Sequence, residues 1–375
     1  MAGLGAYLQE VSRAYFAQKG DAFGQLLSFE KSQGVMACGE ALRPGSRVDI
    51  VQMCERQLQN PIDEMMTSHC KAMTAYSQQN YLTAYDSLVT STMAYLKIFK
   101  AAESPWVIEP LYVMIRDLRV MAELADVELK KQGKNTSKLS DAGSQLMRCF
   151  RESLAGAGHK AKKIVTLFIV NQLFKIYFKL NTLHLCKNLI KAVNSPQVLG
   201  FENFPVSQRV TYKFFVGRLS VFNDEYDQAD VDLTYALKHC TKKNTKNKRA
   251  ILLYLVPVRL LRGSLPKPAL LTKHNLPNYI PLVQAMRTGN IRLLNETLQA
   301  EQEELIRTGT YIILEKLKAS VYRTLFKKIH AIHKTTSAKP SQVPLGLIQT
   351  GLAAMGVVMD LDEVECVLVN LIYRK

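Results

Sequence analysis

Apolar residues recur at helical spacing along most of the chain, and the stretch 163–193 shows this pattern most clearly. Its sequence, KIVTLFIVNQLFKIYFKLNTLHLCKNLIKAV, contains no acidic residue, proline or glycine. The pattern pauses at Asn181 and Thr182 and then resumes, which predicts two helices joined by a tight polar turn. We expect the apolar positions of both helices to be core: Leu167, Val170, Phe174, Tyr177, Phe178, Leu183, Cys186, Leu189, Ile190 and Val193.

The second helix of that hairpin carries a motif that recurs along the chain. A polar turn is followed by small or apolar residues at i, i+3 and i+7, as in the second helix of a tetratricopeptide-like hairpin. The copies begin at Tyr81, Leu183, Tyr226 and Ile291. For the third copy, the sequence also predicts the preceding helix, with Gly217 at the position where the two helices pack closely. The widest gap between copies predicts a further hairpin within 106–150, and no alternating strand pattern is present through residue 310.

The N-terminal part is less regular. Residues 4–18 have the pattern of an amphipathic helix, and a second short helix is predicted near Asp21. The segment 33–47 holds three glycines and a proline with weak periodicity, so we expect a loop or linker there. Helical pattern returns at 48–58 and again after Pro61. Further breaks are predicted at 131–141, 154–163, 195–207, 241–248 and 263–281.

The C-terminal part differs in kind from the repeats. A long helix is predicted over 311–333, a shorter one around 344–355, and a third from Asp360 onwards. Three helices in this order, the third short and apolar on one face, suit a helix-turn-helix or winged-helix module. A wing would require a β-hairpin after the third helix, and the sequence ends at Lys375 before one could form.

The predicted fold is therefore all-α: an irregular tetratricopeptide-like solenoid of helical hairpins that ends in an incomplete winged-helix module. We expect three parts, a helical-repeat region over 1–207, a second helical region over 208–310, and the winged-helix part over 311–375.

The net charge of the chain indicates which classes of partner it could bind. The 375 residues include 49 Lys and Arg against 32 Asp and Glu, a net charge of +17. Such an excess favours polyanionic partners, namely nucleic acid, an acidic protein segment or an anionic membrane surface, although a solvated basic surface is the simpler alternative. Cations and acids are also segregated. Residues 233–295 and 316–359 contain no Asp or Glu, with twelve and seven Lys and Arg respectively.

Two groups of cations are candidate binding residues. The densest cluster lies at a helix–helix connection and could contact nucleic acid or an acidic partner, or could be a solvated loop: Lys242, Lys243, Lys246, Lys248 and Arg249. The second group lies on the first and third helices of the terminal module and could contact nucleic acid: Arg323, Lys327, Lys328, Arg374 and Lys375. The third helix begins with four carboxylates that suit a helix N-terminus but would repel phosphate: Asp360, Asp362, Glu363 and Glu365.

Catalytic and metal-binding patterns are missing from the sequence. It contains no GxxxxGK[ST], GxGxxG, HExxH or GxSxG motif, and its seven cysteines form no CxxC pair. His330 and His333 could share a helix face, but two ligands without a carboxylate make a weak zinc site. We therefore expect no enzymatic activity and no cofactor. The N-terminus lacks the pattern of a signal peptide and no apolar run is long enough to span a bilayer, so we expect no membrane insertion.

Several long segments of the chain resemble those of a known family. They are LFIVNQLFKIYFKLNTLHLCKNLI, QRVTYKFFVGR, KNKRAILLYLVPVRLL, ILEKLKASVYRTLFKKI and VLVNLIY. Together with the Gly289-Asn290 turn and the three-helix tail, they resemble the PCI domain family, strongly from about residue 160 to 373. The family continues past the third helix into a wing hairpin and a further tail, and this sequence stops before both.

The resemblance implies a scaffold subunit of the transcription-export complex TREX-2, acting in mRNA export at nuclear pores. It implies a nuclear, pore-associated and partly cytoplasmic location. It also implies two protein partners, a large germinal-centre-associated PCI scaffold protein and the small acidic split-hand/foot deletion protein, and RNA or another single-stranded nucleic acid. The alternative is a pure protein-interaction subunit whose basic field serves only the acidic partner.

Overall fold

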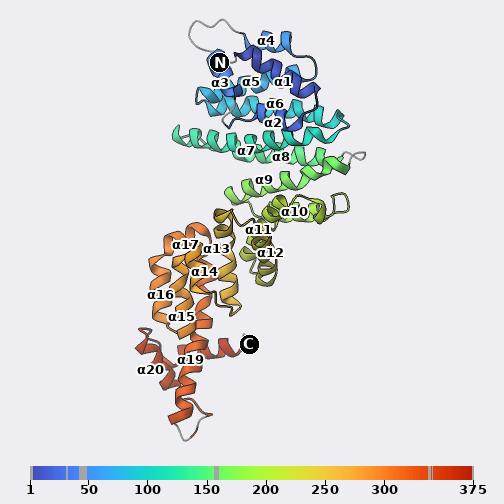
Figure 1. Ribbon diagram of the computed structural model, residues 1–375. Helices are drawn as coiled ribbons and strands as arrows, with labels where there is room; N and C mark the ends of the chain where they lie inside the picture. The colour runs from blue at the N-terminus through green and yellow to red at the C-terminus, as the bar shows by residue number, and fades with distance from the viewer. Residues whose placement is uncertain are drawn as a thin grey trace. The chain divides into compact units, whose positions relative to one another are not determined.

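The computed structural model describes residues 3–30, 33–41, 49–155, 160–336, 339 and 341–373, and these residues form helices and turns without any β-strand (Figure 1). The predicted all-α fold is confirmed. Contacts divide the chain into two compact units, Met1–Tyr212 and Lys213–Lys375. The division into 1–207, 208–310 and 311–375 stays a prediction.

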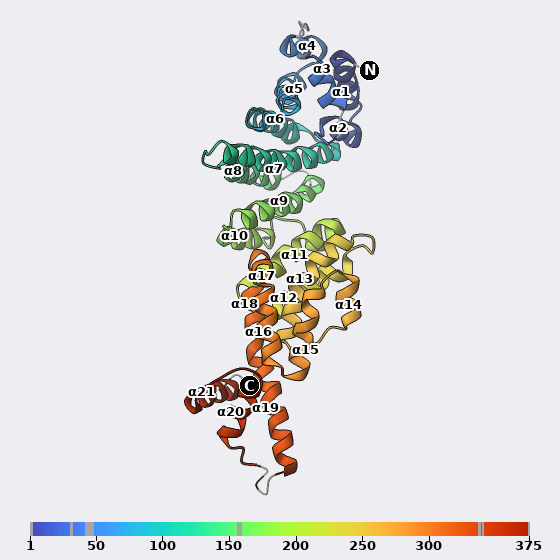
Figure 2. The ribbon, with the colours of Figure 1, turned by 90° about the vertical axis from the view of Figure 1, so that its left-hand side faces the viewer.

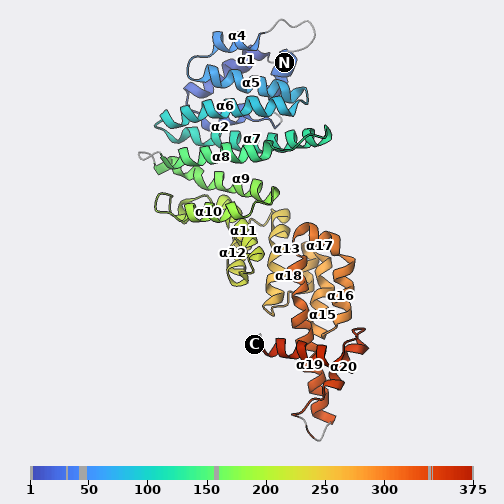
Figure 3. The ribbon, with the colours of Figure 1, turned by 180° about the vertical axis from the view of Figure 1, so that it is seen from behind.

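From α5 to α9, the helices of the first unit stack in chain order, whereas α2 packs on α7 (Figure 1). Figures 1 and 3 show α5 to α9 as successive layers, each packed on the one before. Its helices are α1 (Leu4–Phe16), α2 (Gly20–Leu27), α3 (Gln33–Ala41), α4 (Ile50–Gln57), α5 (Ile62–Ser77), α6 (Tyr81–Ala101), α7 (Ile108–Lys131), α8 (Lys138–Ala155), α9 (Val165–Lys179) and α10 (His184–Val193), with α11 (Val206–Phe222) crossing the boundary. The pair α7 and α8 confirms the hairpin predicted within 106–150.

The hairpin of α9 and α10 forms where the sequence pattern predicts it. The turn between them contains Asn181 in a left-handed conformation (φ 56°), which asparagine tolerates better than most residues. Phe174 and Tyr177 are buried, as are Cys186 and Leu189 from α10. The remaining predicted core positions of the hairpin are buried or half-buried, so the assigned helical register is confirmed.

The loop predicted over 33–47 is wrong for residues 33–41, which form α3. Ala37 and Cys38 are buried there, and Gly34 lies directly against Tyr7, where a Cβ atom would come within 2.7 Å of the Tyr7 ring. These small residues allow close packing of a helix, whereas sequence alone associates them with a turn. Residues 42–48 of the predicted loop lie outside the described residues.

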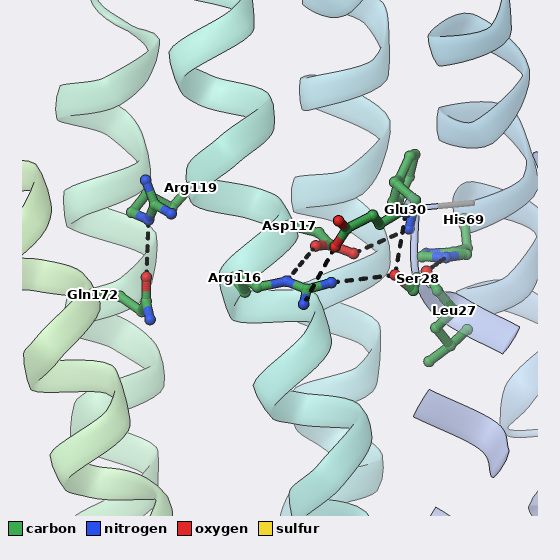
Figure 4. Close-up of polar contacts among 9 residues, drawn as sticks. Leu27, Ser28, Glu30, His69, Arg116, Asp117, Arg119 and Gln172 are labelled. Carbon is green, nitrogen blue, oxygen red and sulfur yellow. Dashed lines mark hydrogen bonds and ion pairs between the residues drawn. The ribbon is translucent and has the colours of Figure 1, made fainter. Parts of the chain in front are cut away.

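A buried polar cluster fixes the turn that follows α2 (Figure 4). The carboxylate of Asp117 on α7 accepts a hydrogen bond from the backbone N–H of Phe29 (3.2 Å) and one from the neighbouring Arg116 (3.0 Å). On α5, His69 Nε2 lies 2.8 Å from the carbonyl oxygen of Leu27, so this nitrogen carries the proton and donates. Burial lowers the pKa of His69 to about 4, and the ring is neutral at neutral pH.

The second unit is a helical bundle followed by a terminal module. Beyond α11, its helices are α12 (Tyr226–His239), α13 (Thr245–Leu261), α14 (Pro268–Lys273), α15 (Ile280–Thr288), α16 (Ile291–Ala300), α17 (Gln302–Thr308), α18 (Tyr311–Glu315), α19 (Leu317–Thr336), α20 (Leu345–Ala354) and α21 (Leu361–Tyr373). The break predicted over 263–281 therefore contains the short helix α14, and the helix predicted over 311–333 is divided into α18 and α19 at Lys316.

Close packing of α11 on α12 confirms the position assigned to Gly217. A Cβ atom on Gly217 would lie 2.8 Å from Leu233 Cγ and 3.2 Å from its backbone nitrogen. Leu233 and Ala229 are both fully buried on α12. Small residues at this crossing let the two helix backbones approach each other.

The terminal module consists of α19, α20 and α21, in the order that the sequence predicts. Figure 2 shows α20 and α21 beside α19. They share a small core of Leu325, Phe326, Ile348, Leu352 and Val364.

Candidate nucleic-acid interface

The cation cluster predicted from the sequence forms one corner of the second unit. Lys242 and Lys243 lie in the turn between α12 and α13, and Lys246, Lys248 and Arg249 lie in the first turns of α13. All except the half-buried Lys248 are exposed. We call these five residues the basic corner.

The acid-rich segment 224–232, around the start of α12, is largely neutralised by cations outside the basic corner. Four of the five carboxylates of this segment pair within the second unit: Asp232 with Lys213, Asp230 with Arg259 and Arg262, Asp227 with Arg262, and Asp224 with Lys316. Among the described residues, none of the five cations of the basic corner forms an ion pair. The corner is therefore uncompensated positive charge within the described structure.

The start of α13 adds to this positive field. The first turn of the helix contains no acidic residue, and the side chain of Asn244 at the N-cap position makes no capping hydrogen bond. The backbone N–H groups at a helix N-terminus carry the positive end of the helix dipole. Lysines placed here repel that end, an arrangement that costs stability unless an anion binds.

The structure brings further residues to the basic corner that sequence spacing did not indicate. Arg249 Nε donates to the carbonyl oxygen of Asn275 (3.0 Å), which fastens the end of α14 beside the start of α13. His274 has a pKa lowered by partial burial and by the charges of Lys273 and Lys248, so Lys273 belongs to the same positive region. In the sequence, Lys273 lies in the proline-rich break more than twenty residues from the cluster, and no local signal connects the two.

The candidate residues of the terminal module have different surroundings. Lys328 Nζ donates to the carbonyl oxygen of Thr288 (2.9 Å), the last residue of α15, so it satisfies a helix C-terminus. Arg323 is exposed and lines a groove with Tyr226 and Leu371. Lys327 is exposed and has no ion-pair or hydrogen-bond partner within the described part of the chain. The remaining two candidates, Arg374 and Lys375, lie outside the described residues.

The carboxylates at the start of α21 have a structural role. Asp360 Oδ1 accepts from the backbone N–H of Glu363 (2.7 Å), and Glu363 Oε2 accepts from the backbone N–H of Asp360 (3.1 Å). This reciprocal pair is a capping box, which satisfies otherwise unpaired N–H groups at the helix start. Asp362 and Glu365 remain exposed on the same helix, so this end of the module is unfavourable for phosphate.

The described residues provide neither a metal site nor a membrane span. No cluster of His, Cys, Asp or Glu suited to a metal ion is present in residues 3–30, 33–41, 49–155, 160–336, 339 and 341–373. His333, one of the two histidines of the weak candidate zinc pair, has its Nε2 atom 2.8 Å from the carbonyl oxygen of Gln342. No helix in the same residues combines the length and apolar character needed to cross a membrane.

Comparison with known proteins gives several relatives that align with nearly the whole of this chain, although no family model matches it. The chain is 38% identical to PCI domain-containing protein 2 of Xenopus laevis over 374 residues, covering 98% of this chain and 90% of the relative. It is 36% identical to PCI domain-containing protein 2 of Danio rerio, covering 99% and 91% respectively. It is also 38% identical to enhanced ethylene response protein 5 of Arabidopsis thaliana, covering 98% and 89%.

Proposed function

Because the chain belongs to the family of PCI domain-containing protein 2, we propose that it is a non-enzymatic subunit of the transcription-export complex TREX-2 that binds single-stranded RNA through its basic corner. At the level of the family, the chain is a PCI-type scaffold subunit of a larger complex. The proposal adds a role in mRNA export at nuclear pores, with a nuclear and partly cytoplasmic location. Its protein partners are the large germinal-centre-associated PCI scaffold protein and the small acidic split-hand/foot deletion protein.

One observation carries the RNA-binding part of the proposal. The five cations of the basic corner lie in the α12–α13 turn and the first turns of α13 and form no ion pair among the described residues, whereas Asp224, Asp227, Asp230 and Asp232 pair with other cations. Phosphate groups bind where helix N-terminal N–H groups and unpaired Lys or Arg converge. Lys327 on α19 is the one residue of the terminal module that we include in the RNA surface, because Lys328 is engaged by Thr288.

The test is an electrophoretic shift titration of the full chain with one single-stranded RNA at several salt concentrations. A variant with Lys242, Lys243 and Lys246 changed to Glu should bind at least about tenfold more weakly, and its salt dependence should be shallower by about 2 in log–log slope, since about 0.7 counterion is released per neutralised phosphate of a single strand. The matched control changes the exposed lysines 130, 131 and 134 of the first unit to Glu, which alters net charge equally.

The same variants distinguish the alternative, a subunit that contacts only proteins. If the basic corner serves only the acidic partner, its variant will release that partner while the RNA titration is unchanged. Equal loss of RNA binding in the corner variant and the control would show that only net charge matters, and would contradict the assigned surface.

A further inference from the structure

Thr245 stands at the centre of the basic corner with its hydroxyl group free. It is the first residue of α13 and is exposed. Its backbone N–H donates to the carbonyl oxygen of Lys243 (3.0 Å), but its Oγ1 has no hydrogen-bond partner among the described residues. Many other Ser and Thr hydroxyls at helix ends in this unit are engaged, as Thr272 Oγ1 is by the carbonyl oxygen of Pro268. Thr245 therefore offers an accessible hydroxyl that no described contact uses.

The residues before Thr245 give it a distinctive charge context. Lys242 and Lys243 occupy the positions three and two residues before it, and no other Ser or Thr in the sequence has basic residues at both positions. Protein kinases select substrates by charge pattern, and a kinase with an acidic substrate groove favours cations at these two positions. The two lysines lie in the exposed turn between α12 and α13, where an enzyme can reach them.

We propose that Thr245 is a phosphorylation site for a basophilic Ser/Thr protein kinase and that its phosphorylation closes the basic corner to RNA. The first half rests on the exposure and charge context of Thr245 alone. The second half, the regulation of RNA binding, rests on the proposed function of the basic corner.

The transfer uses ATP as the phosphoryl donor. Thr245 Oγ1 forms a bond to the γ-phosphorus, the bond from that phosphorus to the β–γ bridging oxygen breaks, and ADP leaves with the electron pair. The hydroxyl proton passes to the catalytic carboxylate of the kinase.

The phosphate would sit where the structure already favours an anion. It would lie at the N-terminus of α13, next to Lys246 and close to Lys242, Lys248 and Arg249 in the chain, and would add about two negative charges. Intramolecular pairing would then take up the lysines that RNA would otherwise contact. We expect about tenfold weaker RNA binding at physiological salt and a salt slope shallower by roughly 1 to 2. Favourable interaction with the helix dipole should at the same time make α13 more resistant to hydrogen exchange.

The first experiment tests the site itself on the full chain. A purified basophilic kinase and ATP should incorporate one phosphate, located at Thr245 by tandem mass spectrometry. Thr245→Ala should abolish that phosphate, and Thr245→Ser should retain it. Lys242→Ala with Lys243→Ala should lower the rate of phosphorylation at least tenfold. Phosphorylation elsewhere with Thr245 unmodified, or an unchanged rate in the double lysine variant, overturns the assignment.

The second experiment compares RNA titrations of unmodified, phosphorylated and Thr245→Ala protein, the last also treated with kinase and ATP. Weaker binding and a shallower slope only in the phosphorylated protein support the regulation. Phosphorylation at Thr245 with unchanged RNA affinity overturns the regulation and leaves the proposed function intact. If the unmodified protein does not bind RNA at all, the proposed function and the regulation both fail, while the mass spectrum still decides whether Thr245 is a phosphorylation site.

Discussion

Gly289 determines how the terminal module joins the helical part of the second unit. It ends α15 in a left-handed conformation (φ 74°), and an added Cβ atom would lie 2.7 Å from the backbone nitrogen of Leu325 on α19. Gly289→Ala should therefore combine backbone strain with a clash against a helix that cannot move aside easily. We expect a loss of roughly 3 kcal/mol in the free energy of unfolding, measured by urea denaturation.

Gly263→Ala is the matched control in the same unit. Gly263 also has a left-handed backbone (φ 79°), but open space surrounds its Cβ position. In the Gly263→Ala control, the free energy of unfolding should fall only by the cost of backbone strain, about 1–2 kcal/mol. Equal losses in the two variants would mean that contact with α19 is not what requires glycine at position 289.

His69 should make the first unit sensitive to mild acid. Burial lowers its pKa from 6.5 to about 4, so the unfolded state binds a proton at a higher pH than the folded state does. Stability is therefore complete above pH 6.5 and is lost as the pH falls toward 4, by roughly 3 kcal/mol in all. Burial raises the pKa of nearby Asp117, which acts with the opposite sign.

The measurement is the free energy of unfolding between pH 7 and pH 5, where His69 contributes roughly 2 kcal/mol of the decline. His69→Gln should flatten the pH dependence over this interval even though it lowers the stability at pH 7. A slope unchanged by the substitution would show that other groups cause the decline.

At the scale of single residues, the sequence predicted burial better than polar contacts. Phe174 and Tyr177 follow from helical spacing because each side chain's direction is set by its own helix. The contacts from Lys328 to Thr288 and from Arg249 to Asn275 join residues 40 and 26 positions apart. Such pairs depend on how helices pack, which no local pattern contains.

At the scale of helices, polar turns in the sequence predicted the helix starts correctly, whereas glycine content predicted a loop where a helix forms. Each copy of the recurrent motif begins a helix within one residue of its predicted start: α6, α10, α12 and α16. The segment 33–41 was expected to be a loop because of its glycines, yet Gly34 lies where α3 approaches Tyr7. Glycine marks turns and close helix contacts alike, and only packing distinguishes the two uses.

The close packing of α11 against α12 can be tested by substitution. Ala229 is fully buried on α12, close in the helix to Leu233, which contacts Gly217. Ala229→Leu should overpack this crossing and lower stability by about 1–3 kcal/mol. Val231→Leu adds bulk at a position on the same helix that is 61% exposed, and it should leave the melting temperature nearly unchanged. Identical melting of both variants would contradict the packing of α12.

At the scale of the whole molecule, the sequence could indicate the basic corner only in part. All five of its cations lie within residues 242–249, so their charge density was visible without a structure. Lys273 joins the same region only because α14 folds back beside α13. The pairing of the acid-rich segment with Arg259, Arg262 and Lys316 was also hidden, since these cations lie at least 29 residues away.

Charge reversal should rank the two candidate RNA surfaces of the second unit, the basic corner and α19. One variant carries Lys242→Glu and Lys243→Glu in the basic corner, and the other carries Arg323→Glu and Lys327→Glu on α19. Both change the net charge by the same amount, and neither removes Lys328, whose contact with Thr288 supports the fold. The corner variant should lower the salt slope of RNA binding by about 1.4, because two cations that form no ion pair among the described residues are lost.

The α19 variant should lower the slope by less than half as much. The exposed carboxylates of α21 weaken the attraction of the terminal module for phosphate, and Arg323 lies in a groove beside Leu371. Circular dichroism of both variants checks that the fold is retained before the titrations are compared. The salt slope of RNA binding is proportional to the number of phosphates that the protein neutralises. A larger loss of affinity and slope in the α19 variant would therefore reverse the ranking and make the terminal module the principal RNA surface.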